Sequence, residues 1–551
     1  MQALPPYKKV RDKIAVQKPT RIMFTGSKSL HKYIGLIALV YFLLMAISGV
    51  LLNHPLMIRG ISVPPGWLPP GFRHVNWDRM AMREVVFSPN DRSTMMVGGR
   101  AGVWQSRDGG HTFSALGAGF PSSAYDRDTF CLLLTASSRP PYLYAGTRSG
   151  LYRYDFKQAH WQAIDRDHFG NVEIVDLVQR KDQLLVWTGS GCYILDETQA
   201  RPVLHPTALR SDTPAPVRAP LTRLLLRLHD GSVLGVPGKL MVDGVGLLLG
   251  FLSFSAIFIW FIPWRNKHLK TRGNGSRLFR SLHMYHRKVG IWAAVLLAII
   301  ALTGVFIRPP FRQTIAGSRV PAGWLGKARS AVHGWERIDR AVYLAQDDSI
   351  LIATDNGFFK GPADFSRPFE KLVINLPVGG MGLDVLDPLT DGRLLMGSFR
   401  GLYVWDPATN AITNIRGRST AGGHNPGKSV DRAVGAAIFK GELLFWADYR
   451  EGLKMVRSDA AQPVMPPEIA AHAGLSLWHV LFLIHNGRIF QDWIGNYTGW
   501  IVPIGGIALV IVVLSGSYDW LHRKGVWRKK KKNGQPRPTP KAHPALVKRV
   551  R

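Results

Sequence analysis

Four histidines stand at matching places in two copies of one sequence unit. His31 opens an apolar stretch that closes at Ser48-Gly49-Val50, and His286 opens another that closes at Thr303-Gly304-Val305. His229 and His485 each precede a further apolar run, in Leu228-His229-Asp230-Gly231 and Ile484-His485-Asn486-Gly487. The members of each pair are about 255 residues apart, which is the pattern that a tandem duplication leaves. Because imidazole is a common metal ligand, these four side chains are the candidate ligands.

The duplication also predicts how the histidines meet. On a helix with 3.6 residues per turn, His31 and Gly49 lie about five turns apart on one face. Two copies packed about a pseudo-twofold axis bring His31 and His286 together from opposite sides, and the same operation relates His229 and His485. Two imidazoles on opposite sides of one iron are the arrangement of a bis-histidine haem. For one copy alone, the alternative is a glycine-mediated helix contact with a histidine at the interface.

Four other histidines near the apolar runs lack a histidine in the second copy. His54 aligns with Pro309, His479 with Arg223, His283 with Lys28 and His522 with Asn266. They are second choices as ligands, and we expect them at the membrane interface or in contact with the propionates of a cofactor.

Four apolar segments must position these residues. Each is long enough to cross the roughly 30 Å hydrocarbon core as a helix. They are Ile34–Leu52, Gly244–Pro263, Val289–Ile307 and Thr498–Tyr518. The sequence therefore predicts a multi-pass membrane protein with four membrane helices in contact with the lipid bilayer.

The distribution of charge predicts the topology. Of the formal net charge of +33, most falls in the N-terminal arm, in the connection from Arg265 to Lys288, and in the tail after Trp520. Basic residues beside membrane helices mark the cytoplasmic side, so both termini are predicted to be cytoplasmic and both large loops periplasmic, as in a bacterial inner membrane. The run Lys529–Lys532 also suggests nucleic-acid binding, but the topology interpretation is favoured and no nucleic-acid partner is predicted.

The two large loops carry short β-type runs separated by Gly, Pro, Asp and Ser. Hairpins are predicted three times in each loop, around Gly102, Gly150, Gly191, Gly357, Gly401 and Gly452. Units of about 40–50 residues with a hairpin at fixed phase are typical of β-propellers. Ser106-Arg107-Asp108-Gly109-Gly110-His111-Thr112-Phe113 resembles the Asp-box turn of sialidase-type and photosystem-assembly-factor propellers, where it is structural. We expect one six-bladed propeller, because an open array would expose strand edges; two separate β domains are the alternative.

The fold class is thus mixed, with membrane α-helices and an all-β external region. The predicted order is a cytoplasmic basic arm (1–30), a first membrane helix (31–53), a periplasmic half-propeller (54–228), a second membrane helix with its preceding histidine segment (229–264), a basic cytoplasmic loop (265–285), a third membrane helix (286–308), a second half-propeller (309–474), an interfacial helix with the fourth membrane helix (475–521) and a basic cytoplasmic tail (522–551).

Cysteine usage limits the cofactors. Cys131 and Cys192 both lie in the first loop, where they form either a disulfide or two buried free thiols. The absence of Cys-x-x-Cys-His excludes covalent c-type haem, and two cysteines cannot hold an iron–sulfur cluster. No Gly-x-Gly-x-x-Gly fingerprint for a dinucleotide is visible.

Three stretches resemble the PepSY-associated transmembrane family: Leu30–Gly49, His286–Gly304 and His485-Asn486-Gly487-Arg488-Ile489-Phe490. They share its His-x-x-x-Gly helix start, its Ser/Thr-Gly helix end and its His-Thr-Gly-Arg-hydrophobic-Phe segment. Some members are inner-membrane siderophore-iron reductases with two b haems on histidines. The resemblance implies His31, His286, His229 and His485 as ligands of two bis-histidine b haems. This sequence departs from the family pattern at Asp230 and Asn486, where Thr is usual, and in its propeller-like external region.

The leading hypothesis is a di-haem b protein that passes electrons from the cytoplasmic side, from quinol or a separate reductase, to a periplasmic acceptor such as a ferric chelate. A second hypothesis makes the chain the membrane haem subunit of a larger redox complex, with the propeller as a docking platform. A third is a non-redox membrane scaffold or assembly factor. The sequence leaves the donor, the acceptor and the oligomeric state open.

Overall fold

The computed structural model describes residues 8–135, 141–196, 202–214, 216–269, 276–326, 334–415, 431–456 and 462–524. Parts of the predicted arm, cytoplasmic loop and tail, at 1–7, 270–275 and 525–551, lie outside the described residues. The chain divides into two units. The helical unit comprises Met1–Leu39, Leu252–Ala298 and Ala508–Arg551, and the large unit comprises Val40–Phe251 and Ile299–Ile507.

Within the described part of the chain, three helical segments are long and apolar enough to cross a membrane. They are α6 (Val236–His268), α7 (Ser276–Phe306) and the segment Arg488–Arg523, which ends in α13 (Ile501–Arg523). A fourth span is present if α1 (Lys8–Ile37) and α2 (Leu39–Asn53), which bend at Ala38, count as one. The first predicted span is therefore two helices, whereas the other three fall on α6, α7 and α13.

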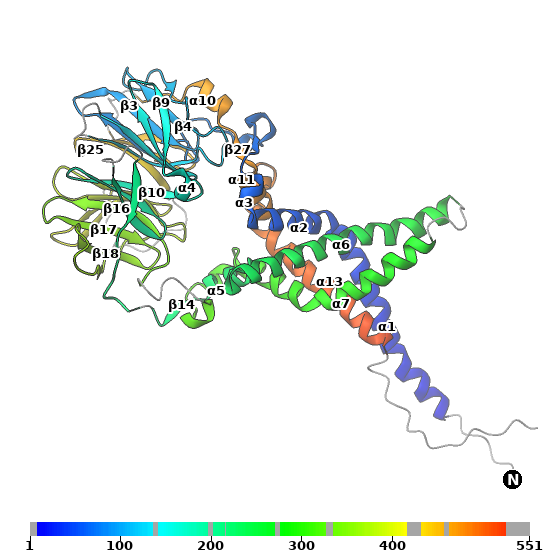
Figure 1. Ribbon diagram of the computed structural model, residues 1–551. Helices are drawn as coiled ribbons and strands as arrows, with labels where there is room; N and C mark the ends of the chain where they lie inside the picture. The colour runs from blue at the N-terminus through cyan, green and yellow to red at the C-terminus, as the bar shows by residue number, and fades with distance from the viewer. Residues whose placement is uncertain are drawn as a thin grey trace, which may run out of the picture. The chain divides into compact units, whose positions relative to one another are not determined.

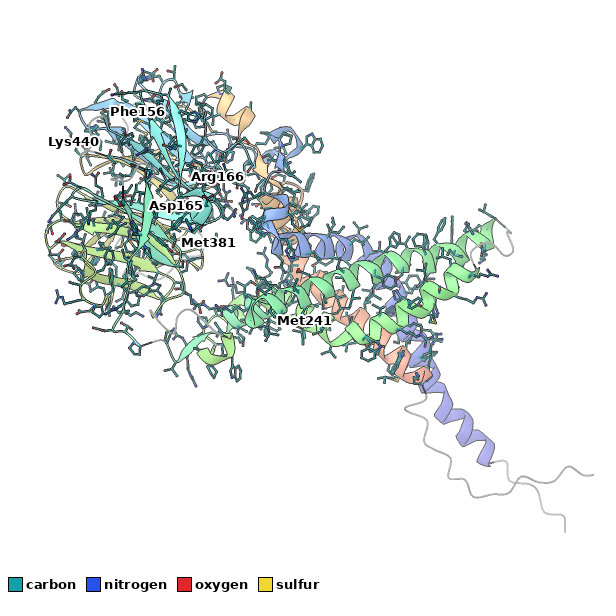
Figure 2. The ribbon with its side chains drawn as sticks, in the orientation of Figure 1. Phe156, Asp165, Arg166, Met241, Met381 and Lys440 are labelled. Atoms are coloured by element: carbon teal, nitrogen blue, oxygen red, sulfur yellow. The ribbon has the colours of Figure 1, made fainter. Side chains whose placement is uncertain are left out.

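The spans have the surface of membrane helices. Between 28% and 39% of the most apolar window of each single span is buried, so most of its apolar side chains are uncovered by protein. Met241, near the start of α6, is likewise uncovered, with 43% of its surface exposed (Figure 2). Apolar helix surface of this extent is stable against lipid, and the chain is a membrane protein with several candidate spans.

Shorter helices connect the spans to the strands. They are α3 (Pro55–Ile58), α4 (Arg166–Phe169), α5 (Leu221–His229), α8 (Phe311–Thr314), α10 (Pro467–His472), α11 (Leu477–His485) and α12 (Gln491–Ile494).

The loops contain groups of consecutive antiparallel strands. The first loop forms β2 (Glu84–Ser88), β3 (Asp91–Gly99), β4 (Gly102–Ser106) and β5 (Ser114–Ala115); β6 (Thr129–Leu134), β7 (Leu143–Thr147), β8 (Gly150–Asp155) and β9 (His160–Ile164); and β10 (Ile174–Arg180), β11 (Gln183–Thr188), β12 (Gly191–Asp196) and β13 (Val203–Pro206). The second loop forms β16 (Ile338–Leu344), β17 (Ser349–Thr354), β18 (Gly357–Pro362) and β19 (Glu370–Leu372); β20 (Leu383–Pro388), β21 (Leu394–Ser398), β22 (Gly401–Asp406) and β23 (Ala411–Asn414); and β24 (Ala433–Phe439), β25 (Glu442–Asp448) and β26 (Gly452–Met455). The fold class is mixed, as predicted.

Strand β2 joins the two loops. It pairs in parallel with β24, with Glu84 opposite Ala436, so that β26, β25, β24, β2, β3, β4 and β5 form one sheet. The first strands of successive groups also contact one another, in the order β2, β6, β10, β16, β20, β24 and back to β2. The strands of both loops therefore form one β region (Figure 1).

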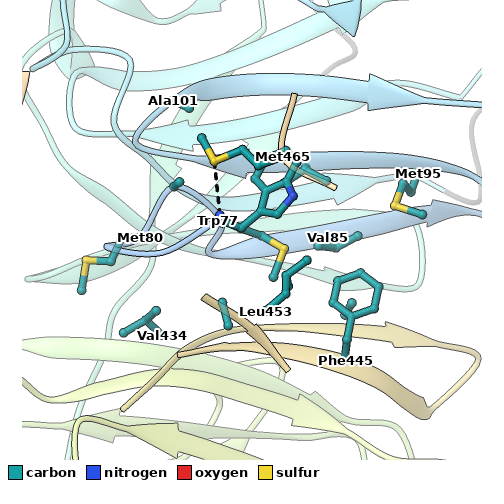
Figure 3. Packing of buried hydrophobic residues seen from close by; sticks show 14 of the residues in the cluster. Trp77, Met80, Val85, Met95, Ala101, Val434, Phe445, Leu453 and Met465 are labelled. Atoms are coloured by element: carbon teal, nitrogen blue, oxygen red, sulfur yellow. Dashed lines mark hydrogen bonds between the residues drawn. The ribbon is translucent and has the colours of Figure 1, made fainter. Parts of the chain in front are cut away.

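A buried core stabilises the junction of the two loops. Trp77 is 1% exposed, and its backbone N–H donates to Met465 Sδ at 3.2 Å (Figure 3). Val85 and Met95 of the first loop pack in the same cluster as Phe445 of the second. Full burial of one such side chain stabilises a fold by about 1.5–3 kcal/mol, so this shared core favours the pairing of β2 with β24.

The six predicted hairpins are present. They are β3–β4, β7–β8, β11–β12, β17–β18, β21–β22 and β25–β26. At Gly150 the turn needs glycine, because φ is 122° and an added Cβ would lie 2.8 Å from the Phe169 carbonyl oxygen.

The predicted Asp-box turn joins β4 to β5. Asp108 Oδ1 accepts from the Ser106 hydroxyl at 2.8 Å and from the Thr112 N–H at 2.9 Å, and Oδ2 accepts from the Thr112 hydroxyl at 2.6 Å. These bonds hold the pKa of Asp108 well below its ordinary value. Because both carboxylate oxygens are used within the turn, its role is structural.

Both cysteines are free and buried. Cys131 lies on β6 and Cys192 on β12, in different hydrophobic clusters. Burial raises the pKa of both thiols. Of the two alternatives from the sequence, buried free thiols are the one observed.

Two short sheets link the copies in the large unit. Strand β1 (Ser62–Val63), which follows α3, pairs with β27 (Leu475–Ser476), which leads into α11. Its counterpart β15 (Arg319–Pro321) pairs with β14 (Arg218–Pro220), which leads into α5. Each copy thus contributes a short strand. That strand pairs with the residues that lead into the histidine-bearing helix of the other copy.

Candidate functional site

The first histidine pair, His31 and His286, comes from α1 and α7 in the helical unit. The ring centres are 6.3 Å apart and the ring planes are perpendicular, at 90°. His31 Nδ1 lies 2.9 Å from the Val512 carbonyl oxygen on α13, and His286 Nδ1 lies 2.8 Å from the Ser255 hydroxyl on α6. These contacts occupy Nδ1, so Nε2 of each ring is the nitrogen left to bind a metal.

The second pair, His229 and His485, comes from the last residues of α5 and α11 in the large unit. The ring centres are 6.1 Å apart and the planes are inclined by 64°. His485 Nδ1 lies 2.9 Å from the Ser48 hydroxyl on α2. His229 Nδ1 lies 3.1 Å from both the Thr303 hydroxyl and the Ile300 carbonyl oxygen on α7. Each imidazole therefore hydrogen-bonds a helix of the other copy, and Nε2 again remains.

The glycines that close the apolar stretches make room for this second pair. A Cβ added at Gly49 would lie 3.4 Å from His485 Cε1, and one added at Gly304 would lie 3.2 Å from His229 Cε1. The contact at Gly304 is tighter than an ordinary van der Waals contact, so the His229 ring would have to shift by a few tenths of an ångström, whereas the contact at Gly49 is at the lower limit of the ordinary range. The Ser/Thr-Gly pair thus has one physical role in both copies: the hydroxyl holds Nδ1 and the glycine admits the ring.

Matched helix contacts surround the second pair. A Cβ added at Gly246 would lie 2.8 Å from Val50 Cγ2, and one added at Gly506 would lie 2.6 Å from Val305 Cγ2. Small residues let membrane helices approach closely, and here they do so at equivalent places in the two copies. The duplication read from the sequence is therefore repeated in the packing.

Both pairs fit a bis-histidine haem. An iron held by two imidazole nitrogens at roughly 2 Å each places the ring centres about 6 Å apart. The observed separations are 6.3 and 6.1 Å. Across the described residues, no group of three or more His, Cys, Asp or Glu side chains could hold a metal ion. Each pair would supply two imidazole nitrogens to a metal whose other ligands would come from a cofactor.

The four histidines without a symmetry mate have other neighbours. His54 Nε2 lies 2.8 Å from Asp243 Oδ2, His283 stacks on Phe279 at 5.8 Å, and His522 stacks on Phe24 at 4.2 Å. His479 lines a small pocket with Arg100, Asp128, Arg148 and Trp478. These contacts give each of the four a packing or electrostatic role.

Sequence reasoning missed the serines of the helical unit. Ser255 contacts His286, and Ser515 Oγ lies 3.4 Å from His31 Nδ1. The two serines are about 260 residues apart, whereas the histidines are about 255 apart, so a search at one fixed interval passes over them. The extra residues lie between His485 and the following span. Aligning the second and fourth spans separately would have found the serines.

The sequence profile of the PepSY-associated TM region matches residues 179–523, which is more than half of the chain. The chain belongs to this family. In this PepSY-associated membrane protein, the matched range includes His229, His286 and His485, whereas His31 precedes it. The role of His31 is therefore inferred from its place in the first copy.

Other comparisons are weak. The sequence of this PepSY-associated protein has no match among curated proteins. The extracellular domain of a hybrid two-component system from B. thetaiotaomicron aligns at 12% identity with a TM-score of 0.34, covering 72% of this chain and 35% of that one. A second such domain from the same organism aligns at 10% identity with a TM-score of 0.33, covering 69% and 39%. The Dos1 propeller aligns at 10% identity with a TM-score of 0.27, covering 68% and 90%. The chain spans less than half the length of the first two, and none of these similarities assigns a function.

Proposed function

We propose that this protein holds two b haems, one between His31 and His286 and one between His229 and His485, and transfers electrons across the bacterial inner membrane. The observation that carries the proposal is the repeated geometry, with ring centres 6.3 and 6.1 Å apart and Nδ1 engaged in every ring. When bound, haem supplies an iron that gains and loses one electron at a time.

The residues of the chain orient the ligands. A backbone carbonyl or a hydroxyl at Nδ1 fixes the rotation of each imidazole and raises the basicity of Nε2. Gly49 and Gly304 keep the second pair close to its helices, and the apolar spans exclude water from both pairs. The same arrangement in both copies favours a shared ligand role over four unrelated helix contacts.

The proposed topology places both termini and the connection between α6 and α7 in the cytoplasm, with both loops in the periplasm. Arg265 and Lys267 lie in the last turn of α6, as expected at a cytoplasmic end. Reporter fusions at residues 120, 275, 400 and 545 test this topology. We expect periplasmic signals at 120 and 400 only, and a periplasmic signal at 275 would contradict it.

We further propose that the β region is a six-bladed propeller that receives the electron acceptor in the periplasm. The strand groups, the cyclic contacts of their first strands and the β2–β24 pair support this architecture, in which few strand edges are exposed. The acceptor would be a ferric chelate, and the donor quinol or a cytoplasmic reductase.

Haem content tests the central proposal. The purified full chain should show a low-spin b-haem spectrum with two haems per chain. Replacement of His31 or His286 by Ala should remove one haem, and replacement of His229 or His485 should remove the other. The control is His54→Ala, which alters an ion-paired histidine and should retain both haems. Loss of a haem in His54→Ala or His479→Ala, with both retained in His229→Ala, would contradict the pairing.

Two further experiments separate the alternatives. A chain without haem absorbance would favour the non-redox scaffold. A haem-loaded chain that is inert toward ferric chelates and co-purifies with another redox protein would favour a subunit of a larger complex, with the β region as its docking platform.

A further inference from the structure

The turns between the second and third strands of the six strand groups share an unusual composition. They are Arg100–Ala101, Arg148–Ser149, Gly189–Ser190, Asp355–Asn356, Phe399–Arg400 and Tyr449–Arg450–Glu451. Four of the six carry an arginine, although a tight turn does not require one. This repetition suggests a task at this end of the strands that the hairpins themselves do not explain.

Arginines gather around Tyr449. The Arg79 guanidinium lies 5.9 Å from the Tyr449 ring centre, and the Arg79 N–H donates to the Tyr449 carbonyl at 2.9 Å. Arg100 donates to the Arg79 carbonyl at 3.3 Å. The charges of Arg100, Arg488 and Arg79 hold the pKa of Tyr449 below its ordinary value, although burial by itself raises it.

The same basic surface continues to His485. The Arg308 guanidinium donates to the Asn486 carbonyl at 2.8 Å, and the backbone N–H of Arg488 donates to Asn486 Oδ1 at 2.9 Å. Burial and the charge of Arg488 lower the pKa of Arg308. Arg450 is largely exposed, and its partial burial, with the charges of Arg432, Arg488 and Arg79, lowers its pKa as well. We call Arg79, Arg100, Arg308, Arg450 and Arg488 the arginine face.

The arginine face has donors without acceptors. Of the described residues, Arg100 Nε, Arg308 Nε and Asn486 Nδ2 are buried and have no hydrogen-bond partner, and Asn486 is only 5% exposed. A buried donor without an acceptor is costly, and so are like charges without a counter-charge.

One carboxylate meets the arginine face, since Asp78 Oδ2 lies 3.6 Å from Arg79 Nε. The other neighbouring carboxylates are engaged elsewhere: Asp128 pairs with Arg148 at 2.9 Å, and Glu451 pairs with Lys454 at 2.8 Å. Because Asp78 alone does not balance five arginines, the group that would satisfy the arginine face is an acceptor with negative charge that comes from outside the described residues.

We propose that the arginine face binds a small anion that carries carboxylate groups. The planar guanidinium matches a carboxylate with two parallel hydrogen bonds, and five of them suit a ligand with several carboxylates. The role of this anion rests on the proposed function: it is a carboxylate-bearing ferric chelate that accepts an electron near His229 and His485. The carboxylates of a haem held by those histidines have the same chemistry, so the test separates the two sources.

Calorimetric titration of the full chain with gallium citrate tests the binding, because gallium citrate is anionic and is not reduced. Arg100→Gln, Arg450→Gln and Arg488→Gln should each weaken binding by about tenfold or more, as expected for loss of a charge-assisted hydrogen bond. Arg450 is exposed, so its replacement leaves the core intact. The matched control is Arg92→Gln, which changes an exposed arginine near the opposite end of β3 and should bind as the wild type does.

The source of the carboxylates follows from a second titration with the variant His229→Ala/His485→Ala, which should lack only the haem of the second pair. Equal affinity in the wild type and in this variant supports an external chelate. Binding only by the variant supports carboxylates of that haem as the natural occupant. The proposal is overturned if the three glutamine variants bind as tightly as the wild type, or if neither protein binds gallium citrate. Failure of the proposed function is separate: the spectrum would lack haem while gallium citrate still bound.

Discussion

Helices α5 and α11 occupy equivalent places in the two copies. The β-region side chains that α5 contacts are carboxylates, whereas those around α11 include several arginines. On α5, Arg223 pairs with Asp355 at 2.7 Å, and Arg227 pairs with Glu336 at 3.0 Å. These pairs are half-buried, and Asp355 also accepts from the Glu336 N–H at 2.9 Å. Carboxylates of the β region therefore hold the first helix.

On α11, His479 takes the place of Arg223 and lies in a pocket with Arg100, Asp128 and Arg148. Burial, together with the positive charges of Arg100, Arg148 and Arg83, keeps the pKa of His479 well below its ordinary value, although Asp128 opposes this. A neutral ring thus stands where the first copy has a cation.

The contrast separates two tasks of the duplicated unit. The contacts to the paired imidazoles are alike in both copies, with Ser48 answering Thr303 and Gly49 answering Gly304. The charged groups that each helix meets on the β region differ, with carboxylates at α5 and mainly arginines at α11. The imidazole contacts are thus the same in both copies, whereas the contacts of each helix with the β region differ, and the arginine face lies on the side of α11.

The largest loss of stability is expected when α11 is given the arginine that α5 carries at the equivalent position. His479→Arg places a permanent charge among arginines, where the one carboxylate of the pocket, Asp128, is already shared by Arg83 and Arg148. We expect a loss of about 3–5 kcal/mol in the free energy of unfolding. Thermal unfolding of the purified protein measures it. His479→Gln keeps the site neutral and should lose far less; equal stability of His479→Arg and the wild type would refute the asymmetry.

Removing the Ser48 and Thr303 hydroxyls should test the imidazole contacts that both copies share. Ser48→Ala and Thr303→Val each take a hydrogen-bond partner from one imidazole of the second pair, and such contacts change metal affinity by about 10- to 100-fold. Haem loss to an excess of an apo haem-binding protein measures the effect, and both variants should release one haem faster. Ser123→Ala, which alters a hydroxyl remote from the histidines, is the control. An effect in one copy only would show that the two copies are not equivalent.

Breaking the ion pair on α5 should have a smaller effect. Arg223→Gln removes the side-chain partner of Asp355 while two backbone N–H donors remain, and we expect a loss of about 1–2 kcal/mol. Arg393→Gln removes an exposed pair with Asp391 and should cost less than about 0.5 kcal/mol. Chemical unfolding of the two variants compares them directly, and similar losses would mean that α5 is held by other contacts.

The smallest effect concerns pH. Because the folded-state pKa of His479 lies below its unfolded value of 6.5, protonation favours the unfolded chain as the pH falls below about 6.5. His479→Gln lacks this linkage, so its stability relative to the wild type should rise between pH 7 and pH 5. Parallel melting curves at each pH measure the difference, and a constant difference would show that His479 is not titrating against the arginines.

Much of this architecture could be predicted from local sequence pattern. The spans and hairpins follow from apolar periodicity, and the pairing of His229 with His485 follows from a repeated motif at a constant interval. The break at Ala38 was missed because the matching stretch of the second copy is one continuous helix, α7. The serines of α6 and α13 were missed because they lie about 260 residues apart and belong to no motif at the constant interval. The opposite polarity of α5 and α11 was missed for another reason, since Arg223 meets Asp355, and His479 meets Arg100, only after distant segments have folded.

The strand pairs that join the two copies affect the order in which the protein folds during synthesis. Ser62 pairs with Ser476, and Glu84 with Ala436, so strands made early during synthesis wait for partners made near the end. Until the second loop has been synthesised, the edge of β2 is open and the approach to α11 does not exist. Contacts this distant along the chain form late and leave edges exposed to aggregation. Completion of the second loop, rather than of the first, is therefore the step at which the β region of this membrane protein matures.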